Sequence, residues 1–313
     1  MILNIILSIV GFAMLIKCAD FFVDGASSFA AIFKIPTIVI GLTIVAFGTS
    51  APELAISFSS HISGNTDMLF GNVLGSNIAN IFVILGLAVL IVPFKIENDV
   101  IRKQIPILLL VTAGAAVLFL SAPHNGLSRS DGVILILFFS IFVYYLITIL
   151  RNKNGKKDES KPAKYKLPMS ILMMILGLGG IILGSNLVVS NLAAFAETIG
   201  ISQKIISVTI ISVGTSLPEL VTTVMAAKKG ENNMAIGNIV GSNIFNIAIV
   251  LGLPVLVLGD AFTEAFGIVD IVFLLAAVVL LWIFTASDRR LRRYEGAVLV
   301  LGYLVYIGYI FLQ

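Results

Sequence analysis

The sequence predicts an all-α integral membrane protein of ten transmembrane helices, arranged as two inverted repeats of five. Three observations predict this fold class. The 313 residues are 58% hydrophobic and 12% charged, about half the charged share of a soluble domain, and the mean hydropathy is +1.08. Basic residues concentrate in alternate loops, and the two halves of the chain resemble each other. This composition excludes a water-soluble globule, a disordered chain and a nucleic-acid-binding protein.

Ten stretches are apolar and long enough to cross a bilayer, which takes about 20 residues per helix. They are 2–22, 37–60, 68–92, 104–121, 131–150, 168–190, 203–227, 233–258, 266–286 and 294–312. The first has neither the basic flank nor the cleavage site of a signal peptide, so we expect a membrane span there. We expect repeat 1 over 1–150, a charged aqueous linker over 151–167 and repeat 2 over 168–313, all within a single membrane domain.

Lysine and arginine mark one side of the membrane. The loops after the first, third, fifth, seventh and ninth spans hold 17 of these residues, and the other loops hold only Arg129 and Lys204. The positive-inside rule then places the 151–167 loop in the cytoplasm and both termini outside it. The sequence therefore predicts a multi-pass protein of the plasma (cell inner) membrane.

The internal repeat has an offset of 166 residues. It aligns 48–54 (GTSAPEL) with 214–220 (GTSLPEL), and 75–80 (GSNIAN) with 241–246 (GSNIFN). Between 41–90 and 207–256, 23 of 50 positions are identical without a gap. Because each repeat holds five spans, the second copy enters the membrane from the opposite side. Inverted repeats of this kind are typical of secondary transporters, which bind substrate near the bilayer midplane. Some channels share the architecture, so it favours a carrier without excluding a channel.

Glu53 and Glu219 lie deep within the second and seventh predicted spans. A charge at the centre of a membrane helix costs about 2.5–3.5 kcal/mol. No lysine or arginine lies at comparable depth, so we expect a cation from solution to compensate the carboxylates. The alternative is a pair of protonated glutamates that are merely hydrogen-bonded in the core.

A proline precedes each glutamate, Pro52 in the first repeat and Pro218 in the second. Proline removes one backbone donor and clashes with the carbonyl four residues earlier. Non-helical backbone at this depth is tolerated where it lines a cavity or is buried in protein. We therefore predict that helices 2 and 7 are interrupted, near Thr49 and near Thr215, and that carbonyl oxygens are freed there.

Hydroxyl and amide side chains surround both glutamates. Threonine and serine one turn earlier share the glutamate's helix face, and the third and eighth spans each carry a polar stripe at four-residue spacing. The set comprises Thr49, Ser50, Asn72, Ser76, Asn80, Thr215, Ser216, Asn238, Ser242 and Asn246. Oxygen ligands without sulfur or imidazole suit sodium, calcium, magnesium or manganese. Two carboxylates are neutralised by one divalent or two monovalent cations, which suits exchange, and competition by protons leaves proton coupling open.

These motifs resemble the alpha-repeats of the cation/calcium exchanger superfamily, specifically its prokaryotic sodium/calcium exchanger branch. The resemblance covers nearly the whole chain. It implies a sodium/calcium antiporter that works by alternating access, with calcium bound by Glu53, Glu219 and the carbonyls of Thr49 and Thr215. It also implies an external-side sodium site of Ser76, Ser212, Thr215, Ser216 and Glu219, an internal-side site of Ala46, Thr49, Ser50, Glu53 and Ser242, and a central position completed by Asn80 and Asn246.

Several further expectations follow from this resemblance. In the family, spans 1 and 6 are thought to slide across the core. An asparagine at 246, where potassium-dependent relatives carry an acid, suggests no potassium requirement. The short linker implies no dedicated calcium-sensing domain. We expect no cofactor, a functional monomer, and no partners beyond membrane lipid and the transported ions.

Other functions remain open at the level of sequence. A proton- or manganese-linked exchanger would use the same scaffold, and a passive cation channel is the alternative from another class. We expect no enzyme, because the chain lacks the HExxH and GxSxG motifs and Ser50 and Ser216 have no histidine or lysine at comparable depth.

Overall fold

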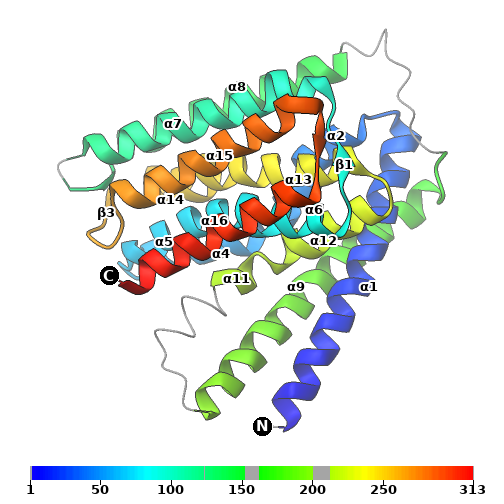
Figure 1. Ribbon diagram of the computed structural model, residues 1–313, viewed down its shortest axis with the longest axis horizontal. Helices are drawn as coiled ribbons and strands as arrows, with labels where there is room; N and C mark the ends of the chain where they lie inside the picture. The colour runs from blue at the N-terminus through cyan, green and yellow to red at the C-terminus, as the bar shows by residue number, and fades with distance from the viewer. Residues whose placement is uncertain (1, 123, 152–161, 200–211, 313) are drawn as a thin grey trace.

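The computed structural model describes residues 2–122, 124–151, 162–199 and 212–312, and most of them are helical (Figure 1). In these residues, seven helices are long and apolar enough to cross a membrane, or eight if one bent pair counts as a single span. This confirms a helical membrane protein. The predicted span 203–227 lies partly outside the described residues, and 294–312 coincides with α16 (Arg293–Leu312), which is not among those helices.

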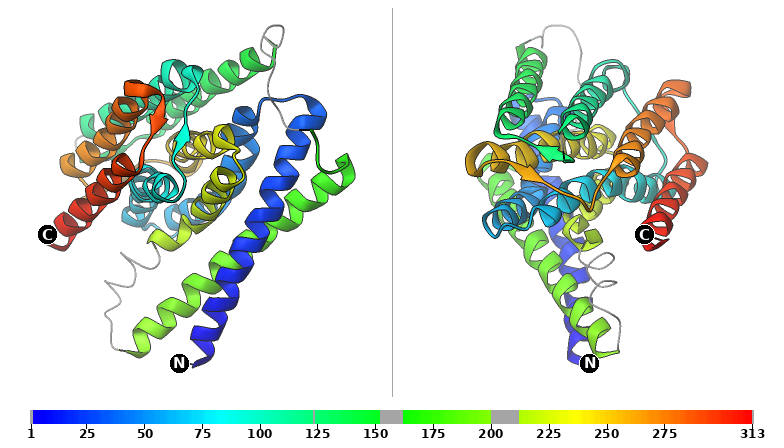
Figure 2. Two further views of the ribbon diagram at one scale, coloured as in Figure 1. Left: turned by 45° about the vertical axis from the view of Figure 1, so that its right-hand side comes forward. Right: turned by 90° about the vertical axis from the view of Figure 1, so that its left-hand side faces the viewer.

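Two 32-residue helices, α1 (Ile2–Phe33) and α9 (Leu167–Thr198), pack side by side. Each is about 48 Å long, and toward the N-terminus the pair projects away from the other helices (Figures 1 and 2). Glycine allows the close approach: a Cβ on Gly177 would lie 2.8 Å from the Phe22 nitrogen, and one on Gly184 would lie 3.0 Å from the Gly11 carbonyl oxygen. The pair therefore meets largely backbone to backbone.

The second predicted span is bent by 45° between residues 49 and 51. The break lies at Ser50, whose φ and ψ of −87° and 8° leave the α-helical region. Pro52 follows in the first turn of the next helix, where a missing backbone donor costs no hydrogen bond. The segments are α2 (Thr37–Ile40), the π-helical η1 (Gly41–Val45), α3 (Ala46–Thr49) and α4 (Ala51–Ile62).

The second half of the chain breaks in the same way. Between α11 (Ser212–Thr215) and α12 (Leu217–Lys228), Ser216 has φ and ψ of −91° and 8°. The two predicted interruptions are thus present with the same backbone geometry at positions 166 residues apart.

Two spans form the interior of the protein. Within Thr66–Ile91, 72% of an apolar 18-residue stretch is buried, and within Asn232–Leu258 the share is 83%. The corresponding share in Arg129–Arg151 is only 17%. Their segments begin 166 residues apart: α5 (Thr66–Ala79), η2 (Asn80–Leu85) and α6 (Gly86–Ile91), then α13 (Asn232–Phe245), η5 (Asn246–Leu251) and α14 (Gly252–Leu258).

The outer helices present large apolar side chains to the surroundings, as a lipid-facing surface requires; Leu137 and Leu304 are 57% and 59% exposed. Two antiparallel strand pairs join loops from the two halves. These elements are β1 (Phe94–Lys95), η3 (Val100–Gln104), α7 (Ile105–Ser121), β2 (Gly126–Leu127), α8 (Arg129–Arg151), β3 (Ala261–Phe262), α15 (Ile268–Asp288), β4 (Arg290–Leu291) and α16.

Candidate cation-binding site

Glu53 and Glu219 occupy equivalent positions in the first turns of α4 and α12. Both side chains are buried, with exposed fractions of 1% and 0%, so neither faces lipid. The N-terminal end of a helix carries partial positive charge from unpaired amide groups, which favours a carboxylate there. The two helix breaks therefore create two favourable places for a buried carboxylate.

The two carboxylates belong to one site. Ser50 Oγ, at the break of the first repeat, donates a hydrogen bond of 2.9 Å to Glu219 Oε1 in the second repeat. Ser50 directly precedes the first turn of α4, which carries Glu53, so this bond brings the two glutamates near each other. The fold thus gathers two carboxyl groups in a buried space, where repulsion between their charged forms would be weakly screened.

Asn72 and Asn238 hold the half-helices that carry the glutamates. The Asn72 amide nitrogen donates to the Glu53 carbonyl oxygen and to Ser57 Oγ, both at 2.9 Å. In the second repeat, Asn238 donates to the equivalent carbonyl at 3.4 Å and to Thr223 Oγ1 at 2.9 Å. Both asparagines therefore position a glutamate through its backbone, a role that the polar-stripe prediction did not specify.

Several buried polar atoms in this region have no hydrogen-bond partner among the residues that the structure describes. An unsatisfied buried group costs about 1–3 kcal/mol, and more when it is charged. These atoms include both carboxylate oxygens of Glu53, Oε2 of Glu219, Oγ of Ser216, and the side-chain amide atoms of Asn80 and Asn246. They come from both repeats and from residues that the sequence analysis singled out. A bound cation with ordered water would satisfy the oxygen atoms among them.

The two central asparagines lie where the helix widens. The π-helical segments η2 and η5 begin at Asn80 and Asn246, and such turns occur frequently at functional sites. A π turn replaces the i→i−4 bonding pattern, so it changes the directions in which neighbouring carbonyls point. The sequence analysis did not predict these turns.

The carbonyl oxygen of Ala46, a predicted sodium ligand, is a meeting point of the two repeats. Thr49 Oγ1 donates to it at 3.3 Å, and Ser242 Oγ donates at 3.5 Å. Thr49 Oγ1 also lies 3.4 Å from Asn238 Oδ1. These long bonds place four of the site's oxygen atoms next to one another.

The remaining predicted residues are placed as follows. Ser76 is buried with an exposed fraction of 3%, and Thr215 is half-buried at the end of α11. Ser212 begins α11, but its side chain lies outside the described part of the protein. Across the described residues, no three His, Cys, Asp or Glu side chains cluster as metal ligands. A cation bound at the two carboxylates would therefore depend on neutral oxygens for its further ligands.

Sequence analysis missed Asn77 and Asn243, the asparagines of the two GSN motifs. Each donates to the carbonyl four residues earlier, at 2.7 and 2.8 Å, and each has a buried Oδ1 that no described residue bonds. The repeat alignment matched these two positions and could have identified them. Their free oxygens make them further candidates for binding a cation or its water.

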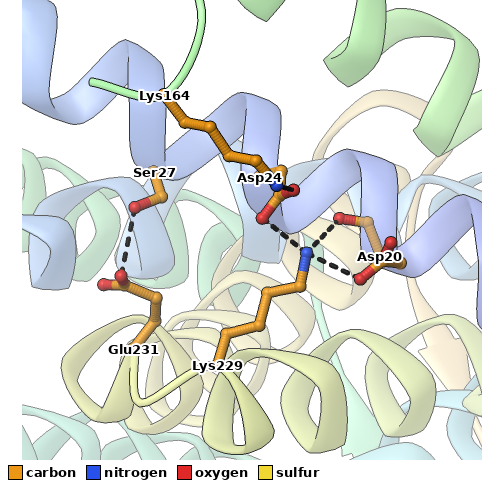
Figure 3. Close-up of polar contacts among 6 residues, drawn as sticks. All are labelled: Asp20, Asp24, Ser27, Lys164, Lys229 and Glu231. Atoms are coloured by element: carbon orange, nitrogen blue, oxygen red, sulfur yellow. Dashed lines mark hydrogen bonds and ion pairs between the residues drawn. The ribbon is translucent and has the colours of Figure 1, made fainter. Parts of the chain in front are cut away.

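A second polar cluster joins α1 to the turn between α12 and α13 (Figure 3). Lys229 Nζ forms ion pairs with Asp20, at 2.7 Å, and with Asp24. Lys164, which lies before α9, pairs with Asp24 at 2.7 Å, and this hydrogen bond raises the pKa of the exposed Lys164 side chain. Lysines that are far apart in sequence thus meet on one carboxylate of α1.

A hydrogen bond extends this cluster along α1. Ser27 Oγ donates to Glu231 Oε1 at 3.2 Å (Figure 3). The α1–α9 pair is therefore attached to the turn that leads into the central helix α13. The sequence analysis did not predict this attachment.

Comparisons with known proteins support the membrane and transport assignments. The profile of the family described as sodium/calcium exchanger protein matches residues 3–148 and 169–312. Inner membrane protein YrbG of Escherichia coli is 35% identical, over 99% of this chain and 98% of its own. The putative antiporter CaxA of Alkalimonas amylolytica is 36% identical, and the sodium/calcium exchanger MaX1 of Methanosarcina acetivorans is 32% identical; both matches cover 98% of each chain.

A solved structure agrees with these relatives. The sodium-calcium exchanger NCX_Mj superposes on this chain with a TM-score of 0.84 at 31% identity, and the match covers 98% of each chain. The name of the matched family is that of an exchanger, and the apolar helices of this chain together with its inner-membrane relative show a multi-pass membrane protein. The family profile, the full-length relatives and this structural match together show that the chain belongs to the sodium/calcium exchanger family.

Proposed function

We propose that the protein exchanges sodium for calcium across the plasma membrane by alternating access, with both ions bound between Glu53 and Glu219. The group of buried, unpartnered oxygens contributed by both repeats carries this proposal. The relatives named as sodium/calcium exchangers support the choice of ions.

The ligand chemistry fits both ions. Calcium takes 6–8 oxygen ligands in a flexible geometry, which two carboxylates with neighbouring hydroxyl, amide and carbonyl oxygens can supply. The proposed set is Glu53, Glu219, Thr49, Thr215, Ser50, Ser216, Ser76, Ser242, Asn80, Asn246, Ala46 and Ser212. One calcium ion or two sodium ions neutralise the two carboxylates, so either load removes the same buried charge.

Coupling follows from this neutralisation. With no cation bound, the change between outward-open and inward-open states would carry two buried carboxylates past an apolar barrier. The high energy of those charges in an apolar environment opposes this conformational change. A loaded site is neutral and passes the barrier at lower cost. The backbone-to-backbone packing of α1 on α9 lets the pair move as one unit against the core, which is the proposed motion.

The proposed membrane topology has ten spans in two inverted repeats, over 1–150 and 168–313. Both termini lie outside the cytoplasm, and the 151–167 linker lies inside it. The matched starts of helix segments 166 residues apart support the repeat. We further propose a functional monomer that needs no resident cofactor.

Calcium uptake into liposomes loaded with sodium tests the function. We expect uptake that depends on internal sodium and is absent when potassium replaces it. Glu53→Gln and Glu219→Gln should each abolish uptake, whereas Glu264→Gln, in an exposed loop, should retain it as the matched control. Full sodium-dependent uptake by either of the first two variants would overturn the proposal.

The same assay separates the alternatives. Uptake driven by a proton gradient without sodium would indicate a proton/calcium exchanger, and preferential uptake of manganese would indicate a manganese exchanger. Calcium flux that needs no counter-ion would indicate a passive channel.

A further inference from the structure

A basic hollow lies at the β1–β4 strand pair, beside the start of α16. It has a volume of about 600 Å³ and is lined in part by Phe94, Lys95, Asn232, Arg290, Arg292 and Arg293. These residues come from both halves of the chain, because β1 follows α6 and β4 joins α15 to α16. The hollow is distinct from the buried glutamate site.

Two positive charges face each other across this strand pair. Lys95 is the direct cross-strand partner of Arg290, and directly opposed like charges destabilise an antiparallel pair. The neighbouring residues Phe94 and Leu291 point inward, with exposed fractions of 4% and 0%, so strand alternation turns both charges to the same exposed side. The strand pair therefore holds two cations together at a cost.

The acidic side chain beside the hollow, Glu295 in the first turn of α16, accepts hydrogen bonds from the Arg292 backbone nitrogen and from Tyr294 Oη. Within the part of the chain that the structure describes, Lys95, Arg290 and Arg293 form no ion pair. Arg293 is also the first residue of α16, where the helix dipole disfavours a cation. An anion seated in the hollow would relieve both the cross-strand repulsion and this unfavourable placement.

The surface next to the hollow is apolar and continuous. From the first turn of α16, one helix face exposes Tyr294, Val298, Leu301 and Val305, with exposed fractions of 58%, 44%, 58% and 63%. Exposed tyrosine is enriched at the level of lipid headgroups, and aliphatic side chains beyond it meet acyl chains. A basic hollow that opens beside such a face matches a phospholipid with an anionic headgroup.

We propose that this hollow binds the headgroup phosphate of an anionic membrane lipid, with Lys95, Arg290 and Arg293 as its ligands and the exposed face of α16 along its acyl chains. Arginine binds phosphate oxygens with two donors in a fixed geometry. Basic pockets beside membrane helices are suited to lipid headgroups of this kind. A soluble anion would satisfy the charges without using the adjacent apolar face, whereas a lipid uses both.

The chain's only tryptophan provides the test. Trp282 is 40% exposed and lies on α15, eight residues before Arg290. The purified full-length protein is placed in phosphatidylcholine vesicles, and its fluorescence is quenched with either brominated phosphatidylglycerol or brominated phosphatidylcholine. We expect several-fold stronger quenching by the anionic lipid at equal mole fraction, and weaker preference at high salt.

Charge-removing variants complete the experiment. Arg290→Gln with Arg293→Gln should abolish the preference, whereas Arg151→Gln with Lys166→Gln, which removes the same charge from exposed positions elsewhere, should retain it. Thermal unfolding checks that both proteins are folded. Equal quenching by the two lipids in the wild type, or an unchanged preference in the first variant, would overturn the proposal. Loss of the preference on adding inorganic phosphate at constant ionic strength would assign the hollow to a soluble anion instead. No outcome depends on transport, so this test is separate from that of the proposed exchange.

Discussion

Single residues set the chemistry of the proposed cation site. Glu53 and Glu219 are buried at the first turns of two half-helices, where helix ends and neighbouring hydroxyls take the place of water. Ser50 Oγ is the clearest of these hydroxyls, because it bonds Glu219 Oε1 directly at 2.9 Å. Hydrogen bonds to a charged group contribute about 1.5–3 kcal/mol, so the loss of one contact should be measurable.

Ser50→Ala should weaken the apparent affinity for calcium by about tenfold, since about 1.4 kcal/mol corresponds to a factor of ten. The variant removes the donor to Glu219 and a proposed ion ligand. Calcium-dependent uptake at graded calcium concentrations measures the change. Ser59→Ala, on the exposed side of the same helix, is the control, and equal affinities for the two variants would contradict the assigned role of Ser50.

Helical elements position these residues. The half-helices α4 and α12 are held by Asn72 and Asn238, which bond the backbone carbonyls of the glutamates. Separately, the α1–α9 pair is attached to the α12–α13 turn through Lys229 and the acidic residues of α1. The asparagine hydrogen bonds fix the two glutamates in place. The Lys229 ion pairs link the helices of the site to the α1–α9 pair, which is proposed to move.

Asn238→Ala should destabilise the protein by about 1–3 kcal/mol, because Asn238 is 1% exposed and its loss leaves buried acceptors without their donor. Thermal unfolding in detergent measures this. Asn233→Ala, at an outer position of the same helix that bonds Glu97, should have a smaller effect because exposed contacts contribute less. Similar losses of stability would argue against the anchoring role.

Lys229→Gln should loosen α1 from the core by about 1 kcal/mol, the scale of a partly exposed ion pair. Asp20 and Asp24 would then repel each other, and among the described residues Lys164 would remain as the ion-pair partner of Asp24. Faster amide hydrogen exchange at the Asp20–Asp24 end of α1 measures the change. Lys228→Gln provides a neighbouring control of equal charge, and identical exchange in both variants would contradict the attachment.

The whole molecule brings two repeats together around one site. Because the ligands come from both halves, an occupied site should hold the halves together. A ligand that binds only the folded state stabilises it by about 2.7 kcal/mol at a hundredfold excess over Kd. A bound cation would gain this stabilisation by contacting the buried oxygens that have no partner among the described residues.

Calcium should therefore raise the unfolding temperature of the wild-type protein in detergent, and a chelator should reverse the increase. The variant that combines Glu53→Gln with Glu219→Gln should show no calcium-dependent increase. Magnesium, which demands a small octahedral site and dehydrates reluctantly, should stabilise less than calcium. An equal calcium effect in the double variant would mean that the ion stabilises the protein from another site.

The sequence by itself determined the membrane class, the internal repeat, the two interruptions and the buried glutamates. These features follow from local causes, since composition, hydrophobic length and proline act within a few residues. Only the tertiary structure decided the Ser50–Glu219 contact across 169 residues, the anchoring of backbone carbonyls by Asn72 and Asn238, the π turns at Asn80 and Asn246, and the joining of α1 to Lys229. Each of these depends on which helix faces meet and at what depth, and this is fixed by packing between segments that are far apart in the chain.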